Sequence, residues 1–369
     1  MSEKKLRIVM LNWRDPENPL AGGAERVTLG YLADLAERGH EVFWLTHSYE
    51  GCEKTTEISG VRVIRLGNLI RSRIRAYIWV KNHFPIDLLI DQHHGIPWFT
   101  NLWAPCPAIS YIHEVLGPIW KSFYPFPLAQ LGIMQERITL WFYRKQKFWT
   151  GCQTTQTHLK DAGVRDVTII PYGVDLKPLQ TLPTKILEPP LRLAMVSRLA
   201  PNKRVHLGVA LLKSLNEQGV DTYLKIMGTG ECESEIRRVI SDNGMQDRCE
   251  LLGHVEEGEK LAHLQEAHFL VHTSMREGWG LNVVEANAYG TPAVVFPVPG
   301  LIDSTTHLET GYISKYEDVA SLALVILEAI QNPKVYQECR KNALMRARSH
   351  LWEEVLPHAR SFVLTSAQS

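Results

Sequence analysis

A repeated alternation of short β-branched runs with helical patterns constrains the fold of this chain more than any other feature. The first series of runs contains LRIVML, HEVFWLT, VRVIRLG, DLLIDQ, AISYIH and VTIIPYG. A second series contains LRLAMVS, TYLKIMG, CELLGHV, HFLVHTS and PAVVFPV, and helical patterns lie between the runs, for example at 25–37, 206–218 and 234–243. Strands that alternate with helices predict βαβ units and a parallel sheet. Each series therefore predicts a doubly wound α/β domain of its own.

The length of 369 residues is also too great for one ordinary hydrophobic core. Between the two series lies LKPLQTLPTKILEPPL, which has four prolines in sixteen residues and no apolar period, so we expect a linker at about 176–190. We predict two Rossmann-like domains, 1–180 and 190–350, followed by a C-terminal helix in 351–369. Open α/β sheets bind ligands at the carboxyl ends of their strands. Two such domains facing each other across a cleft would accept a nucleotide and a second substrate.

Composition narrows the class of protein further. Hydrophobic residues make up 45% and charged residues 22%, which is typical of a globular chain. The 40 basic and 40 acidic residues cancel, which argues against a protein that works mainly by coating nucleic acid or an acidic membrane. Six cysteines without any C-x-x-C pair, and no secretory signal ahead of LRIVML, favour reduced thiols and a cytoplasmic location. The longest stretch without a charged residue, Gly95 to Ile112, is broken by three prolines and predicts no membrane span.

Glycine-rich turns mark the first candidate ligand site. Gly22 and Gly23 stand between the first strand and the first helix, in PLAGGAERV. Such glycines let backbone N–H groups approach an anion at a helix N-terminus. The spacing differs from G-x-G-x-x-G, so a tight turn without a ligand is an equal alternative.

A basic loop follows the first strand of the second series. In SRLAPNKR, Arg198 and Lys203 lie five positions apart at the carboxyl end of LRLAMV. An arginine and a lysine in such a loop can hold a diphosphate from two sides. The alternative is an ordinary solvated loop.

The stretch REGWGLNVVEA contains the most informative pair of acids. Gly278 and Gly280 free the backbone ahead of a helix, Glu277 precedes that helix, and Glu285 lies in its second turn. The two acids cannot share one helix face, so we expect them to reach different parts of one extended ligand. A nucleotide sugar fits, since carboxylates accept hydrogen bonds from the hydroxyls of a hexose and of a ribose. The alternative is that Glu277 caps the helix and Glu285 is solvated.

These pieces together resemble a known family. The stretch from Glu277 to Glu285 resembles the E-x7-E signature of family 4 of the retaining glycosyltransferases, which adopt the GT-B architecture. AGGAERVTLGYLADLAERGHEV, YIHEV, IPYGVD, SRLAPNK and AYGTPAVVFPVPG are similar to further motifs of that family, in the expected order along nearly the whole chain. Serine at 197, threonine at 273, and Pro299 and Gly300 depart from the usual pattern and leave the donor sugar open.

The resemblance implies a role for each matching residue. Gly22, Gly23, Arg198 and Lys203 are expected to hold the donor diphosphate. Gly278, Gly280, Leu281 and Asn282 are expected to cover the donor near its sugar and phosphate, and Glu285 to bind the ribose. The expected catalytic residues are Glu277, which contacts the sugar hydroxyls, and His113 of YIHEV, which lines the cleft near the anomeric carbon.

The expected reaction is a metal-independent, retaining transfer of a hexosyl unit to a hydroxyl of a glycan or of a lipid-linked acceptor. No Asp-x-Asp pair occurs in the sequence, so basic side chains and a helix N-terminus would stabilise the leaving nucleoside diphosphate. We expect no cofactor and no bound metal, with a UDP-sugar as co-substrate in preference to a GDP-sugar. A nucleotide-sugar 2-epimerase and a non-catalytic nucleotide-sugar-binding subunit are the alternatives.

Two further patterns bear on partners. Residues 62–81 and 119–149 combine basic and aromatic residues with few acids, which favours peripheral contact with the cytoplasmic face of a membrane; buried aromatics beside solvated arginines are the alternative. No nucleic-acid-binding motif is present. His268 and His272 are spaced too far apart along a strand to share a zinc ion, whereas His93 and His94 follow a strand and leave an acceptor-side role open.

Overall fold

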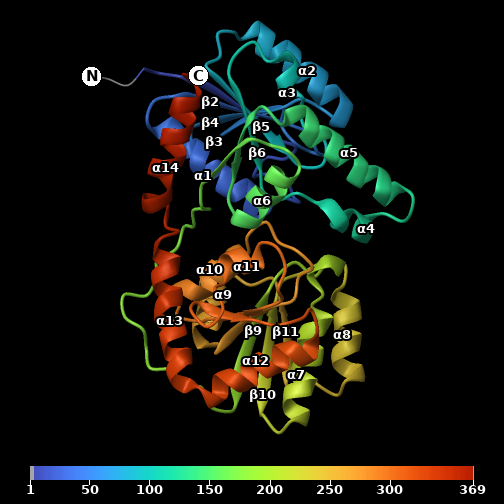
Figure 1. Ribbon diagram of the computed structural model, residues 1–369, viewed down its shortest axis with the longest axis vertical. Coiled ribbons are helices and arrows are strands. Elements are labelled where there is room, and N and C mark those ends of the chain that lie inside the picture. Colours follow the sequence, from blue (N-terminus) through green and yellow to red (C-terminus); the bar gives the residue numbers. More distant parts are fainter. Residues whose placement is uncertain (1–3, 369) are drawn as a thin grey trace. The chain divides into compact units, whose positions relative to one another are not determined.

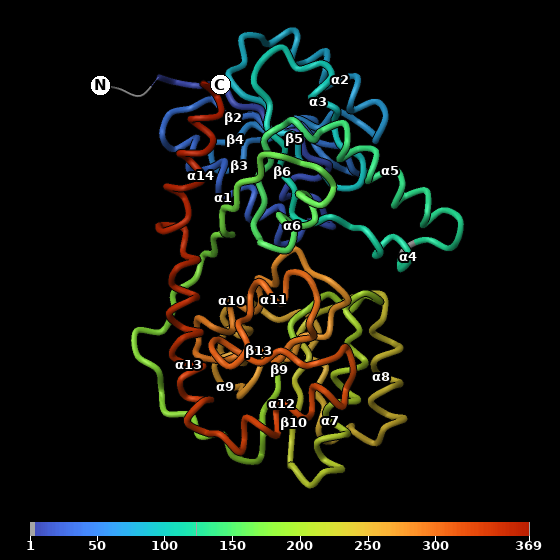
Figure 2. Tube along the Cα trace, in the orientation of Figure 1, coloured from blue at the N-terminus to red at the C-terminus, as the bar shows by residue number. Residues whose placement is uncertain are grey.

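The computed structural model describes residues 4–368, apart from the side chain of Phe123, and divides into two compact units (Figures 1 and 2). The first unit contains the residues up to Gly173 together with those from Trp352 onward, and the second runs from Val174 to Leu351. Each unit is built around one sheet with helices on both sides, as Figure 1 shows. The prediction of two α/β domains with parallel sheets is therefore confirmed.

The first unit has an eight-stranded sheet in the order β3-β4-β2-β1-β5-β6-β7-β8. All neighbouring strands are parallel except β3 and β4, which form an antiparallel hairpin at one edge. The strands are β1 (Arg7–Leu11), β2 (Glu41–Thr46), β3 (Thr55–Ile58), β4 (Val61–Arg65), β5 (Leu88–His93), β6 (Ala108–Ile112), β7 (Lys147–Thr150) and β8 (Asp166–Ile169).

The helices of the first unit cover both faces of this sheet. They are α1 (Gly23–Glu37), α2 (Leu69–Asn82), α3 (Thr100–Trp103), the 3-10 turn η1 (Gly117–Ile119), α4 (Trp120–Phe123), α5 (Leu128–Tyr143), α6 (Gln153–Asp161) and α14 (Trp352–Ser366). Helix α5 ends at Tyr143, and Phe148 belongs to β7. Tyr143, Phe148 and Trp149 are buried, so these members of the basic and aromatic stretch 119–149 belong to the core.

The C-terminal helix α14 packs on α1 within the first unit. The guanidinium of Arg360 donates to both carboxylate oxygens of Asp34, at 2.9 Å each. Trp352 lies against Gly30 and Gly173, where an added Cβ would come within 2.2 and 2.1 Å of its ring. Two glycines thus make room for the indole that fixes the start of α14.

The second unit has a six-stranded, fully parallel sheet in the order β11-β10-β9-β12-β13-β14. Its strands are β9 (Leu191–Val196), β10 (Thr222–Met227), β11 (Cys249–Gly253), β12 (Phe269–His272), β13 (Ala293–Val295) and β14 (Gly311–Ile313). Its helices are the 3-10 turn η2 (Pro201–Lys203), α7 (His206–Glu217), α8 (Glu233–Asp242), α9 (Glu257–Glu266), α10 (Leu281–Ala288), α11 (Leu301–Ser304), α12 (Val319–Gln331) and α13 (Pro333–Arg348). One large apolar core joins the two faces of this sheet.

The proline-rich segment 176–190 has no helix or strand of its own and packs on the second unit. Lys185 is buried there, and its ammonium donates to the carbonyl of Ala267 and to the hydroxyl of Thr291 at 2.5 and 2.9 Å. Burial, together with the smaller effect of the neighbouring charges of Arg340 and Arg192, lowers the pKa of Lys185 to about 7.

Candidate active site

The candidate site in the second unit begins where β9 ends. The chain leaves Val196, passes Arg198, and forms the short turn η2 that places Lys203 beside the loop after β12. Because β9 and β12 are parallel neighbours, their carboxyl ends meet at the same edge of the sheet. Two loops far apart in the sequence therefore lie next to each other.

Lys203 and Glu277 form an ion pair across these two loops. Lys203 Nζ lies 2.5 Å from Glu277 Oε1, and the two side chains are only 21% and 16% exposed. Arg198 lies on the same loop and is exposed, and among residues 4–368 it has no ion-pair partner. The sequence predicted all three side chains at one donor site, and the structure brings Lys203 and Glu277 into direct contact.

The electrostatics keep Glu277 ionised. Burial alone would raise the pKa of Glu277, but the charge of Lys203 and the hydrogen bonds from Lys203 and Ser274 outweigh it and hold the pKa below its ordinary value. His272 Nε2 lies 3.6 Å from the same carboxylate oxygen. Burial lowers the pKa of His272 to about 4, although Glu277 opposes the shift, so this imidazole is neutral at pH 7.

The backbone around Glu277 is held by the loop after β13. The amide of Glu277 donates to the carbonyl of Pro299 at 3.1 Å. Gly300 has φ +80°, and a Cβ there would lie 2.1 Å from the carbonyl oxygen of Glu277. Only glycine fits this conformation and this approach, so the Pro299–Gly300 pair fixes where Glu277 stands.

Helix α10 opens directly behind the ion pair. Gly280 is its N-cap residue, in the left-handed region with φ 96° and ψ 63°. The side chain of Asn282 donates to the carbonyl of Val196 at 2.6 Å, which ties the first turn of α10 to the end of β9. The helix N-terminus with Leu281 and Asn282 therefore borders the same edge as Lys203, and it favours an anion there.

Glu285 lies in the second turn of α10 and is buried rather than solvated. Its carboxylate accepts from Lys260 of α9 at 2.9 Å. Lys260 also pairs with Glu257, at 2.8 Å. Glu285 and Glu277 therefore have different neighbours in the protein, and their contacts with different parts of a ligand stay a prediction.

Several residues at this edge escaped the sequence reasoning. Arg204 donates to the carbonyls of Thr273 and Ser274 at 2.8 and 2.9 Å, and so joins the loop after β9 to the loop after β12. Gly228 and Gly230 follow β10 with φ 139° and 159°, and a Cβ at either would come within 1.9 and 2.4 Å of a carbonyl oxygen of the SRLA loop. The sequence does contain a signal for Gly228 and Gly230, since GTG follows the strand run TYLKIM at its carboxyl end.

The candidate residues of the first unit lie at the carboxyl ends of β1 and β6. The amide of Gly22 donates to the carboxylate of Glu25 at 2.8 Å, so an anion at Gly22 would have to displace Glu25. His113 follows β6, and its Nδ1 lies 3.0 Å from the hydroxyl of Tyr172. Burial and the neighbouring His94 lower the pKa of His113 to about 3, and its Nε2 is buried without a hydrogen-bond partner in the described chain. The imidazole is therefore neutral, with one nitrogen available.

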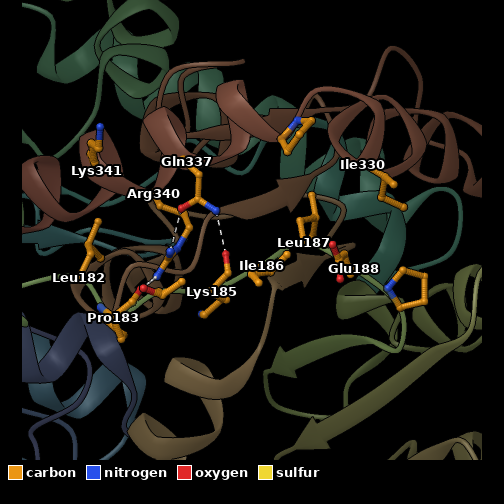
Figure 3. Close-up of a pocket in the computed structure, with 13 residues that line it drawn as sticks. Leu182, Pro183, Lys185, Ile186, Leu187, Glu188, Ile330, Gln337, Arg340 and Lys341 are labelled. Atoms are coloured by element: carbon orange, nitrogen blue, oxygen red, sulfur yellow. Dashed lines mark hydrogen bonds between the residues drawn. The ribbon is translucent and has the colours of Figure 1, made fainter.

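A cavity of about 490 Å³ in the second unit lies elsewhere (Figure 3). It is lined by the proline-rich segment and by α13, and Figure 3 shows Gln337 and Arg340 hydrogen-bonded to neighbours on its wall. Arg340 donates to Gly290 and Pro183 carbonyls as well. Lys185 beside it contacts residues that precede β12 and β13, so the cavity is at the amino-terminal edge of the sheet, away from Lys203 and Glu277.

The two histidine pairs noted in the sequence, His268 with His272 and His93 with His94, lie at or next to strand ends. His268 Nδ1 accepts from the amide of Arg192 at the start of β9, whereas His272 lies at the opposite end of β12. His93 stacks edge-on against Tyr143, with ring centroids 4.4 Å apart, and His94 stacks on Trp13 at 4.0 Å. Within residues 4–368 no group of three or more His, Cys, Asp or Glu side chains could hold a metal ion.

Comparison with known proteins gives the family of the chain. The model of Glycosyltransferase Family 4 matches residues 21–178, and the model of Glycosyl transferases group 1 matches residues 183–346. A glycogen synthase of Mycobacterium tuberculosis is 25% identical over 386 residues, which cover 95% of this chain and 92% of the relative. The amylovoran biosynthesis glycosyltransferase AmsK of Erwinia amylovora is 25% identical over 57% of this chain and 50% of its own length.

Solved structures agree on the fold. A sucrose-phosphate synthase from Thermosynechococcus elongatus has a TM-score of 0.79 at 19% identity, covering 99% of this chain and all of the other. Anabaena Alr3699/HepE, solved in complex with UDP and glucose, has a TM-score of 0.74 at 16% identity, covering 98% of this chain and all of the other. The predicted GT-B class is thus confirmed. Since the two family matches together span nearly the whole chain, this protein belongs to the glycosyltransferases, with Glycosyltransferase Family 4 describing its first half and the group 1 glycosyl transferases its second.

Proposed function

We propose that this glycosyltransferase moves a hexosyl unit from a UDP-sugar to a hydroxyl of a glycan or a lipid-linked acceptor, with retention of configuration and without a metal ion. The observation that carries the proposal is the pairing of Lys203 with Glu277 next to the start of α10. It places a cation, a carboxylate and a helix N-terminus at one strand edge. A cation and a helix N-terminus suit the diphosphate, and a carboxylate can accept hydrogen bonds from the sugar hydroxyls.

The positive charges support departure of the nucleoside diphosphate. Arg198 is exposed and has no ion-pair partner within residues 4–368, so its guanidinium can bind a phosphate bidentately. Lys203 and the N-terminus of α10 add charge from the other side. The lack of any Asp-x-Asp pair in the sequence supports a reaction in which these groups take the place of a divalent cation.

Glu277 serves in the proposal as an acceptor of hydrogen bonds from the sugar. Its carboxylate is already held by Lys203 at 2.5 Å, which suits a positioning group better than an attacking nucleophile. The proposed step is therefore attack on the front face. The bond between C1 and the phosphate oxygen breaks, the acceptor oxygen bonds to C1 on the same side, and the acceptor proton passes to the departing phosphate oxygen.

The remaining residues keep their predicted roles as proposals. Glu285 binds the ribose in exchange for part of its contact with Lys260. The neutral His113, with a free Nε2, hydrogen-bonds the reacting sugar. The choice of UDP and of a glycan acceptor is supported by the complex of Alr3699/HepE with UDP and by relatives named for glycogen and amylovoran synthesis.

The test is the release of nucleoside diphosphate from a panel of UDP- and GDP-sugars, with and without acceptor and with and without EDTA. We expect release with one UDP-hexose, stimulated by an acceptor glycan and unchanged by EDTA. Interconversion of donors without acceptor would instead identify a 2-epimerase. Binding without any release would identify a non-catalytic subunit, and both results would overturn the proposal.

A further inference from the structure

Helix α5 in the first unit has two apolar faces. One face is buried and contains Ala129, Leu140 and Tyr143. The other contains Leu131, Met134, Ile138 and Trp141, which recur every three or four positions and are each about half exposed, with Trp141 at 54%. A surface helix ordinarily turns charged and polar residues to solvent, so this second stripe is unusual.

Helix α2 shows the same arrangement. Ser72, Ala76 and Val80 face the core. Ile70, Ile74, Tyr77 and Ile78 follow helical spacing on the outer side and are exposed, with Ile70 at 72%. Two helices of one unit therefore each present an apolar stripe.

The short helix α3 joins the two stripes into one surface. Asn101 of α3 donates to the carbonyl of Phe142 at the end of α5, at 3.1 Å. On the other side, the rings of Trp103 and Tyr77 pack edge-on with centroids 5.7 Å apart. Figure 1 shows α2, α3 and α5 on the same side of the sheet. We call this surface the apolar face and define it by Ile70, Ile74, Tyr77, Leu131, Ile138 and Trp141.

A shallow hollow adjoins the apolar face at Tyr77, between α2 and α3. Its volume is about 330 Å³, and five of the six residues that line it are apolar. The sixth is Lys81, whose side chain is exposed at the rim. The loop ahead of α5 adds Phe126, which is 82% exposed.

The stretches that contain the apolar face carry almost only basic residues. Residues 66–86 contain four basic residues and no acid, and residues 115–160 contain Glu136 as their one acid. Glu136 is buried and accepts from the amides of Leu116 and Gly117 at 2.7 and 2.6 Å, so it adds no negative charge to the surface. Arg71, Lys81, Arg137 and Lys145 are exposed. For a chain of zero net charge, this is a strong local imbalance.

We propose that the apolar face is a docking surface for an anionic lipid bilayer. The exposed aliphatic and aromatic side chains enter the boundary between headgroups and acyl chains, and the surrounding basic side chains contact anionic headgroups. No helix within the described residues is long and apolar enough to cross a bilayer, so contact is confined to one leaflet. The charge pattern decides the occupant, since a second copy of this chain would bring the same positive charges to the contact. The inference does not depend on the donor chemistry of the second unit.

The experiment is co-sedimentation of the full chain with vesicles of phosphatidylcholine alone or of phosphatidylcholine mixed with the anionic lipid phosphatidylglycerol. We expect binding to the anionic vesicles, weakened by salt. Leu131→Glu/Ile138→Glu and Arg71→Glu/Arg137→Glu should each lower the partition coefficient by about tenfold or more, because each variant removes two side chains that contact the bilayer and adds two negative charges. Leu324→Glu/Met345→Glu, at comparably exposed apolar positions of the second unit, is the matched control and should bind as the unaltered chain does.

Three results would overturn the proposal. The chain could stay in the supernatant with both kinds of vesicle. The control variant could lose binding as much as the Leu131/Ile138 variant. The unaltered chain could be a dimer by light scattering that dissociates on Leu131→Glu/Ile138→Glu, which would make the apolar face a contact between copies. Release of nucleoside diphosphate from a soluble acceptor is measured separately and reports on the proposed function alone.

Discussion

Replacing Lys203 by methionine tests the candidate site most directly. Methionine keeps most of the length of the side chain but removes the charge that lies 2.5 Å from Glu277. The leaving diphosphate then loses one of its two cationic side chains. One well-aimed donor to a developing negative charge is worth about 3 kcal/mol, and 1.36 kcal/mol corresponds to tenfold in rate, so turnover should fall by roughly a hundredfold.

The same substitution should also cost stability, by a smaller amount. With Glu277 only 16% exposed, the variant leaves a largely buried carboxylate without its main partner, at a cost of about 1–2 kcal/mol. Lys203→Met/Glu277→Gln should recover part of this loss, because it removes both charges, while turnover stays low. Lys213→Met, which breaks an exposed pair with Glu217 at 3.8 Å, is the control and should change neither quantity measurably.

The assays are release of UDP under saturating donor and unfolding by urea. Unchanged turnover in both Lys203→Met and Glu277→Gln would refute the proposed site. Turnover restored in the double variant would show that the pair is structural and that Lys203 does not act on the donor.

Three further predictions concern the surroundings of the pair. Gly300→Ala should lower turnover at least about tenfold, because its Cβ would press on the Glu277 carbonyl. The control is Gly219→Ala, at a similar φ of +82° with no atom within 4 Å, which should cost only about 1 kcal/mol of stability. Equal turnover in the two variants would contradict this view of the loop. In the folded protein the pKa of His272 is about 4, below its unfolded value. The free energy of unfolding should therefore fall as pH drops from about 6.5 towards 4, by at most about 1.4 kcal/mol per pH unit. In His272→Gln this decline should be shallower, and an identical decline would rule out the pKa shift. EDTA at millimolar concentration should leave turnover unchanged, and inhibition that Mg²⁺ or Mn²⁺ reverses would show that a metal takes part.

The sequence predicted the α/β class and the two parallel sheets because strand and helix periods are local signals. The resemblance to family 4 assigned Lys203 and Glu277 to one donor site, and the structure adds that the strands they follow, β9 and β12, are neighbours in the sheet. Their direct contact could not be predicted, because it depends on the path of two loops and on Gly300 from a third. The partner of Glu285 was missed for a related reason, since Lys260 lies 25 positions away on the preceding helix.

Other misses came from weighing the wrong signal. The hairpin of β3 and β4 turns at Ser59 and Gly60, with φ of 50° and 78°, and a Ser-Gly pair between β-branched runs is a recognisable hairpin turn. For the aromatic run that ends at Phe148 and Trp149, composition leaves a surface stretch and a buried one open, and the structure places both of these side chains in the core. The spacing of apolar residues is a better guide than composition for a segment like this one, because β7 lies between two other strands and its side chains are buried on both faces of the sheet.

The place of α14 has a consequence for how the chain is made. The second unit is one continuous stretch, so it can fold as soon as it leaves the ribosome. The first unit is not continuous: Gly30 and Gly173 stay uncovered until Trp352, which follows the whole second unit in the chain, fills the space beside them. The first unit is therefore completed only after the second has been synthesised, and a ribosome that stalls within α14 leaves an open first unit tethered to a finished second one.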